Sequence, residues 1–129
     1  MGGDTTRPLI VGGGPAGAAA AITLADRGVP STVLERRPAD RTPGSVCGGL
    51  LTPRASEALA GLGVDARDLG PAVDTIELVA GPRRRRINWP TTSEYPAVIA
   101  SRERLERELL ARAALLGAEV RHGFEALDP

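Results

Sequence analysis

The chain has 129 residues, of which 42% are apolar and 2% aromatic, so it suits one compact domain with an aliphatic core. Its 16 basic residues, all arginine, balance 16 acidic residues, which argues against nucleic-acid binding through overall charge. No apolar stretch approaches the ~20 residues that cross a bilayer, and the start of the chain lacks a secretion signal. The single cysteine, Cys47, fits a reducing compartment, so we expect a cytoplasmic protein.

The first third of the chain predicts a β-α-β unit. After a polar tail at 1–6, residues 7–11 are expected to form a short buried strand. A helix over 14–27 ends at Gly28, and residues 31–35 form a second strand. Such units pair their strands in parallel with a right-handed crossover. We therefore predict an α/β fold with a Rossmann-like parallel sheet.

The middle of the chain predicts a small antiparallel hairpin within this fold. Residues 74–80 alternate in polarity, the Gly-Pro pair at 81–82 turns the chain, and Arg83–Asn88 returns as the partner strand. The run of four arginines would then be split between two faces, so a solvated hairpin is favoured over a phosphate or lipid site. The other predicted elements are a helix from Pro53 to about residue 60 capped by Thr52, a strand at 95–100, a helix after Ser101 to about 116, and a strand from 119.

A glycine motif joins the first strand to the first helix. Gly12, Gly14 and Gly17 match G-x-G-x-x-G: the first permits a tight turn, the second lets a pyrophosphate approach, and the third allows close packing of helix and strand. Pro15 lies where a missing N–H is tolerated, and Ala16 follows it in the first turn. The helix start then offers free N–H groups to phosphates. The alternative is a glycine-rich turn that binds nothing.

An acidic residue follows the second strand at the spacing that dinucleotide sites use. Glu35 lies 18 positions after Gly17, where a carboxylate can accept hydrogen bonds from the ribose hydroxyls of an adenosine. Its charge argues against a 2′-phosphate at that place. Arg36 is the better candidate of the two adjacent arginines for a place near the adenine, because it adjoins Glu35. The motif with its context therefore predicts a dinucleotide site.

Two further stretches carry a resemblance to a known family. The run from Val11 through Arg37 resembles the FAD-binding start of flavoproteins of the para-hydroxybenzoate hydroxylase type, and "VCGGLLTPRASEAL" resembles the C-G-G-x-L-x-P-R-A stretch of the geranylgeranyl reductase family. The resemblance implies an FAD-binding domain in which Cys47, Gly48 and Gly49 line the isoalloxazine and ribityl region. It offers Cys47 as a catalytic candidate. The alternative for Cys47 is a small buried hydrophobe.

A third stretch, "SRERLERELLARAALLGAEV", resembles the superfamily pattern R-x-x-L-D-x-x-L. The resemblance places Arg102 at the cofactor's phosphate and ribityl region, and Glu106 replaces the usual Asp. It also implies a later Gly-Asp motif and a substrate-binding sheet that this chain does not contain. We therefore expect residues 7–129 to be the N-terminal part of an FAD-binding domain, interrupted at about 74–100 on the substrate side, and the isolated chain to be inactive.

Three functions remain open at this point. The resemblance implies an FAD-dependent oxidoreductase that reduces prenyl double bonds with NAD(P)H as electron donor, acting on an isoprenoid or other small molecule with possible peripheral membrane contact. The alternatives are a flavin-dependent aromatic monooxygenase or halogenase, and a non-catalytic nucleotide-binding remnant. We expect no metal site, because His122 has no Cys, Asp or Glu near it at ligand spacing. No hydrolase triad or phosphate-binding lysine is found.

Overall fold

The computed structural model describes residues 6–40, 47–89 and 94–127, so residues 1–5 of the predicted tail lie outside the described part. The chain divides into two compact units. The first is formed by Met1–Ser45 together with Glu103–Pro129, and the second by Val46–Arg102. The first unit therefore consists of two segments that are far apart in the sequence.

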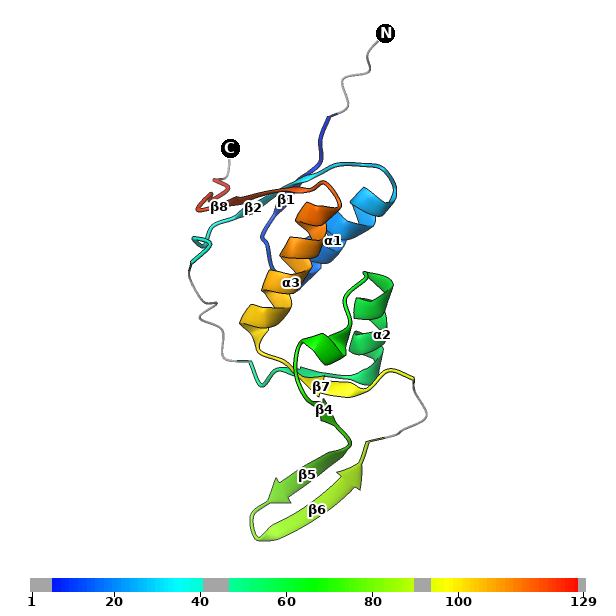
Figure 1. Cartoon of the computed structure of the whole chain (residues 1–129). Helices are drawn as coiled ribbons and strands as arrows, with labels where there is room; N and C mark the ends of the chain where they lie inside the picture. Colours follow the sequence, from blue (N-terminus) through cyan, green and yellow to red (C-terminus); the bar gives the residue numbers. More distant parts are fainter. Residues whose placement is uncertain (1–5, 41–46, 90–93, 128–129) are drawn as a thin grey trace. The chain divides into compact units, whose positions relative to one another are not determined.

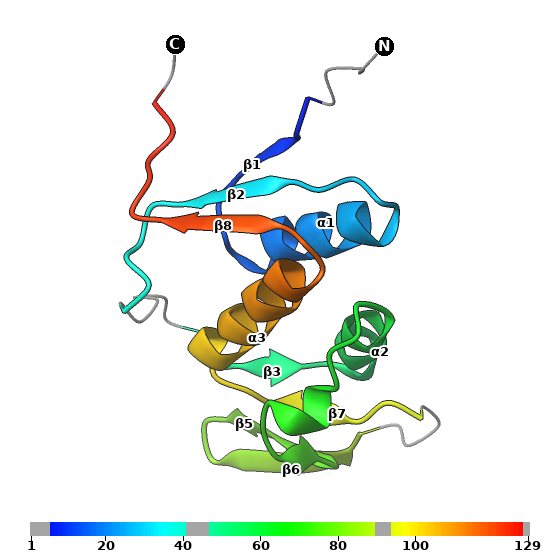
Figure 2. The same ribbon diagram turned by 45° about the horizontal axis from the view of Figure 1, so that its top comes forward.

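The first unit contains a parallel sheet of three strands in the order β1-β2-β8. Its strands are β1 (Leu9–Val11), β2 (Thr32–Glu35) and β8 (Glu119–His122). Helices α1 (Pro15–Asp26) and α3 (Arg102–Leu115) lie on the same face of this sheet (Figures 1 and 2). This arrangement confirms the predicted α/β fold with a parallel sheet and the predicted helix between the first two strands.

The core of the first unit lies between the helices and the sheet. Ala18, Ala21 and Ile22 of α1 are fully buried, and so is Val33 of β2. Leu109 of α3 is 1% exposed. The small alanines let α1 approach the sheet closely, while each buried Val, Ile or Leu stabilises the fold by roughly 1.5–3 kcal/mol. The core is aliphatic, as the composition predicts.

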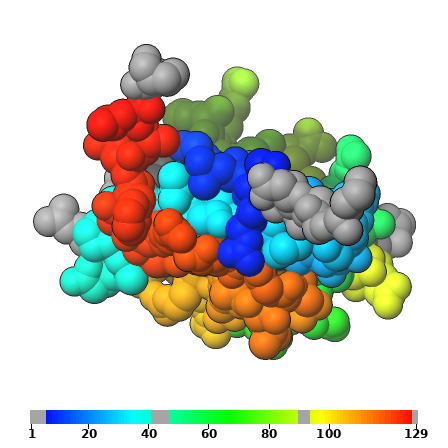
Figure 3. All heavy atoms as spheres, turned by 90° about the horizontal axis from the view of Figure 1, so that it is seen from above, coloured from blue at the N-terminus to red at the C-terminus, as the bar shows by residue number. Residues whose placement is uncertain are grey.

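Strand β1 differs from the prediction that it would be buried. Leu9 is 59% exposed and Val11 is 65% exposed, while Ile10 between them is half-buried. In a strand, alternate side chains point to opposite faces, so Ile10 meets the helix side while Leu9 and Val11 lie on the other face. Figure 3 shows β1 in blue, β2 in cyan and β8 in red-orange on one surface with no helix in front of them. An apolar run therefore predicted the strand but not its environment.

The second unit is built from short elements around helix α2 (Pro53–Gly61). The Thr52 hydroxyl accepts a hydrogen bond from Ala55 N–H over 3.3 Å, which confirms the predicted cap. The sequence pattern did not predict the two shortest strands or the 3₁₀ turn, because runs of two or three residues carry no readable periodicity. The antiparallel sheet of this unit has the order β3 (Leu50–Leu51), β7 (Ala97–Ile99) and β4 (Ala72–Val73), and the 3₁₀ turn is η1 (Ala66–Asp68).

The predicted hairpin is present in the second unit. Strand β5 (Thr75–Ala80) pairs antiparallel with β6 (Arg83–Asn88), and Gly81 in the turn has φ +59°. All six residues of β6 are exposed. Glu77 and Arg84 form an ion pair of 2.9 Å across the strands. The hairpin is therefore solvated, as predicted.

Helix α1 depends on a very close approach at Gly17. A Cβ at this position would lie 2.0 Å from the carbonyl oxygen of Gly12 and 3.3 Å from the side chain of Ile10. Both neighbours belong to the strand and loop that precede the helix, and one of them is backbone. Helix and loop would have to separate to accept any side chain, as expected for the third glycine of the motif.

We predict that Gly17→Ala lowers the free energy of unfolding by about 1–3 kcal/mol or more, because the methyl group overlaps backbone that cannot move alone. Chemical unfolding measures this change. Gly61→Ala is the matched control, since a Cβ at this α2 residue meets nothing within 4 Å and alanine favours a helix by up to about 1 kcal/mol. Equal stability of the two variants would contradict the packing described.

Candidate functional site

The glycine loop leaves the start of helix α1 open. Gly12 has φ +101°, a conformation that residues other than glycine rarely adopt, and its N–H donates to a carbonyl of β2 over 2.8 Å. Gly14 is the N-cap and forms no side-chain cap, and Pro15 has no N–H. The first-turn amides of Ala16 and Gly17 are therefore not capped by a side chain of the N-cap residue. Amides of this kind are the groups that bind anions at helix starts.

Glu35 at the end of β2 bonds directly to this loop. One carboxylate oxygen, Oε2, accepts from Gly13 N–H over 2.8 Å. The other, Oε1, accepts from the backbone N–H and the Nε of Arg37, each over 2.9 Å. Glu35 is only 6% exposed. The Arg37 side chain is the main cause that lowers the pKa of Glu35 to about 2, against burial, which alone would raise it; the backbone N–H groups of Arg37 and Gly13 add to the lowering.

The guanidinium of Arg37 contacts a second carboxylate. Its Nη2 lies 3.0 Å from Oε2 of Glu106, which is on α3 and 6% exposed. These two acidic neighbours raise the pKa of Arg37 further above its usual value, chiefly through the side-chain bond to Glu35. The neighbouring Arg36, which the sequence favoured for a place by the adenine, is exposed. The sequence did not identify Arg37 as part of the site. It lies two positions after Glu35, and the alternation of side chains along a strand could have indicated this contact. Its other partner, Glu106, is 69 positions away and carries no local signal.

A cleft of about 660 Å³ opens at the carboxyl end of β1 and β2. The residues predicted for pyrophosphate, ribose and adenine meet there, since Gly12, Gly14, Glu35 and Arg36 all line it. Phe124 to Ala126 also line the cleft, and sequence analysis did not select them. They follow β8, the parallel neighbour of β2, so the rule that ligands bind at the carboxyl ends of parallel strands would have identified them.

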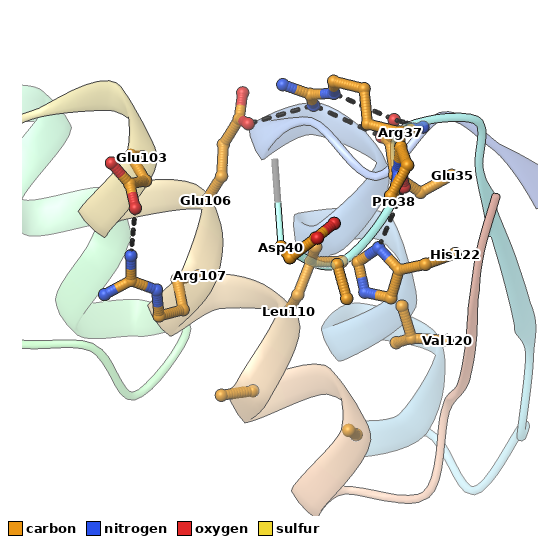
Figure 4. A pocket seen from close by; sticks show the side chains of 13 residues that line it. Glu35, Arg37, Pro38, Asp40, Glu103, Glu106, Arg107, Leu110, Val120 and His122 are labelled. Atoms are coloured by element: carbon orange, nitrogen blue, oxygen red, sulfur yellow. Dashed lines mark hydrogen bonds and ion pairs between the residues drawn. The ribbon is translucent and has the colours of Figure 1, made fainter. Parts of the chain in front are cut away.

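A second cavity, of about 330 Å³, is also bordered by Glu35 and Arg37 (Figure 4). Leu110 and Val120 contribute apolar walls to it. His122 also lines this cavity; it is an exposed residue whose Nδ1 lies 3.3 Å from the carbonyl oxygen of Arg37. Glu35 and Arg37 line both spaces and form part of the wall of each.

The other predicted site residues belong to the second unit. Cys47 is exposed, so the alternative of a buried small hydrophobe is wrong. Gly48 is exposed too, with nothing within 4 Å of a Cβ. Gly49 has φ +72°, and a Cβ there would lie 2.3 Å from the carbonyl oxygen of Ala100, so this glycine is required by backbone packing. Arg102 is half-buried at the first position of α3.

The groups around the cleft fit the adenosine diphosphate part of a dinucleotide. The helix start supplies backbone N–H groups where Gly14 has no side chain to cap them. The cleft provides volume for a nucleotide, and Glu35 supplies a charged acceptor at its wall. Phosphate oxygens and sugar hydroxyls need these two kinds of partner.

The family of the chain agrees with this chemistry. Residues 5–128 match the family model described as FAD binding domain. The chain therefore belongs to the FAD-binding domain family, whose members are flavin-dependent oxidoreductases. The parallel β-α-β unit with its glycine loop is the part of this chain in which the family's nucleotide chemistry is expected.

Two solved structures share the fold of this chain, and a further protein is similar in sequence. A geranylgeranyl bacteriochlorophyll reductase-like protein from Thermoplasma acidophilum is 26% identical, with a TM-score of 0.73 over 91% of this chain and 30% of the other. The 2-methyl-3-hydroxypyridine-5-carboxylic acid oxygenase is 28% identical, with a TM-score of 0.76 over 94% of this chain and 32% of the other. Hydrogen cyanide synthase subunit HcnB of Pseudomonas protegens is 46% identical over 76 residues, which are 52% of this chain and 16% of that protein. The chain thus spans about a third or less of each.

Among the residues that the structure describes, no three or more His, Cys, Asp and Glu side chains gather as a metal site would require. Within the same ranges, no helix is both long and apolar enough to span a bilayer.

We predict that the hydrogen bonds of Glu35 make the free energy of unfolding depend on pH between about 2 and 4.5. The folded pKa of about 2 lies below the ordinary value of 4.5, so the stabilisation is complete above pH 4.5 and is lost as the pH falls from 4.5 toward 2. This loss amounts to up to about 3 kcal/mol. Urea unfolding of wild type and Glu35→Gln across this range measures it. In Glu35→Gln the free energy of unfolding should no longer fall over this pH range as it does in wild type. If both proteins lose the same free energy, the bonds of Glu35 are not the cause. Glu77→Gln, which removes the carboxylate of the exposed hairpin pair, is the control.

Proposed function

We propose that the cleft at the glycine loop binds the adenosine diphosphate part of FAD. The first-turn N–H groups of Ala16 and Gly17, with the positive end of the helix, would hold the pyrophosphate, which Gly14 admits by having no side chain. Gly12, whose N–H is donated to Leu34, would supply the tight turn, and Pro15, which has no N–H, would begin the helix. The observation that carries the proposal is the Glu35 carboxylate, buried beside Gly13 at the wall of the same cleft. When bound, the flavin supplies the redox chemistry, and the protein supplies binding and orientation.

The ribose and the adenine would lie along the rest of the cleft. Glu35 would accept hydrogen bonds from the ribose hydroxyls. Arg36 is exposed at the cleft and would lie beside the adenine, where a guanidinium can stack on an aromatic ring. Phe124 is 53% exposed and lines the same cleft, so its ring is a second candidate for contact with the base.

We assign the flavin end of the cofactor to the second unit on the strength of its sequence motifs. Cys47, Gly48 and Gly49 would contact the isoalloxazine and ribityl region, and Arg102 the phosphate and ribityl region. Exposure of Cys47 and the open space at Gly48 support contact with a flat ring. Cys47 is the catalytic candidate because a thiol there would face ring or substrate.

For the protein as a whole we propose reduction of isoprenoid double bonds, with NAD(P)H as electron donor. The C-G-G-x-L-x-P-R-A motif and the similarity to the reductase-like protein favour this reaction. The similarity to the oxygenase, at a comparable TM-score, supports an aromatic monooxygenase as the second candidate. Products formed with NAD(P)H under oxygen separate the two, because a hydroxylated product or substrate-stimulated peroxide would count against the reductase. A chain that takes up no FAD would instead favour a non-catalytic domain.

We predict that Gly14→Val abolishes FAD binding while the chain still folds. The backbone of Gly14 has φ −69° and ψ 179°, which any residue can adopt, so the main effect of valine is to fill the space that the pyrophosphate needs. Titration of the purified chain with FAD, followed by flavin fluorescence, measures binding, and thermal unfolding checks the fold. A folded Gly14→Val chain that retains the flavin would refute this placement.

We predict that Glu35→Ala weakens FAD binding without affecting FMN, which lacks the adenosine. Each hydrogen bond to a charged group contributes about 1.5–3 kcal/mol, so the loss should be tenfold or more. Equilibrium titration of both flavins gives the comparison. If the FAD affinity of a folded Glu35→Ala chain equals that of wild type, the ribose lies elsewhere.

A further inference from the structure

Two buried carboxylates, those of Glu35 and Glu106, share the guanidinium of Arg37 (Figure 4). We infer that Arg37 and Glu106 are positioning residues, which hold the Glu35 carboxylate in the orientation that receives a ribose diol. The inference rests on the proposed function. It adds two residues that the dinucleotide motif does not contain, one of them from a helix distant in the sequence.

The Glu35 carboxylate already accepts four hydrogen bonds. A carboxylate has about four acceptor positions. Oε1 accepts two bonds of 2.9 Å from Arg37. Oε2 accepts one of 2.8 Å from Gly13 and one of 3.3 Å from Nη2 of Arg37. The contact of 3.3 Å is the weakest of the four, so Oε2 is the atom at which a sugar hydroxyl can bind with least loss.

Nη2 of Arg37 keeps a second partner when its contact with Glu35 is replaced. The same nitrogen also donates to Oε2 of Glu106 at the shorter distance of 3.0 Å. A hydroxyl that takes the place of Nη2 at Glu35 therefore leaves the guanidinium bonded to Glu106. Without the Glu106 carboxylate, Arg37 would be attracted only toward Glu35, and it would compete with the ribose for Oε2. Glu106 thus favours the open acceptor.

The backbone of Glu35 and Arg37 is held in place by hydrogen bonds from the residues that follow β8. The carbonyl oxygen of Arg37 accepts from Gly123 N–H over 3.3 Å, and that of Glu35 accepts from Phe124 N–H over 3.2 Å. Both donors follow strand β8. Because the backbone of Glu35 and Arg37 is anchored in this way, the two side chains meet at a defined place, and Glu106 decides how the guanidinium is shared.

The test compares ADP with 2′,3′-dideoxy-ADP by calorimetric titration of the 129-residue chain. In wild type, removal of both hydroxyls should weaken binding roughly tenfold or more. In Glu106→Gln and in Arg37→Met this ratio should fall toward one, since the carboxylate is then blocked or no longer oriented. Glu106→Asp, which keeps the charge, should restore part of the ratio. Any unfolded fraction lowers both affinities equally, so the ratio does not respond to a loss of stability alone.

Glu103→Gln is the matched control, because Glu103 lies on the same helix and lines the same cavity but pairs with Arg107 (Figure 4). This variant should keep the wild-type ratio. If the ratio is also unchanged in Glu106→Gln and Arg37→Met, the positioning role is refuted while the ribose site stands. If wild type binds no ADP, or binds both nucleotides equally, the proposed function itself fails.

Discussion

The hydrogen bond from Gly13 N–H to the Glu35 carboxylate is the interaction on which the site depends. It joins the glycine loop, which ends the first strand, to the end of the second strand. The same carboxylate is bonded to Arg37, and through it to α3. A buried charge is tolerated only when it is hydrogen-bonded and paired, and Glu35 meets both conditions. The shape of the cleft and the charge at its wall therefore have one common cause.

Much of the first unit could be predicted from sequence because its signals are local. Gly12 and Gly17 each meet a backbone requirement that acts within a few residues, since the structure gives Gly12 a positive φ and Gly17 no room for a Cβ. The hairpin was predictable for the same reason, since alternation and a turn lie within 15 residues (74–88). Sequence periodicity and turn residues predict structure that is set by neighbouring residues in this way.

What could not be predicted depends on distant partners. The exposure of Leu9 and Val11 is decided by what covers the sheet, and an apolar run does not contain this information. Arg36 adjoins Glu35 in the sequence, yet Arg37 is the residue that contacts it, and the second partner of Arg37, Glu106, is 69 positions away. Phe124 to Ala126 become part of the cleft only through the pairing of β8 with β2. Each of these facts follows from tertiary structure.

The order of the chain explains why these distant residues matter. The second unit, Val46–Arg102, separates β2 from α3, so the parallel sheet and its helix layer are completed only when the chain returns. Glu106 and Phe124 both belong to this later segment of the first unit. The motif from Gly12 to Glu35 therefore contains the glycine loop and its carboxylate, but not the residues Arg37 and Glu106 that pair with that carboxylate directly or through Arg37. Glu106, which stands where the resembling pattern has Asp, lies 3.0 Å from Arg37 in this chain, so a helix that is completed late in the sequence is paired with the end of β2.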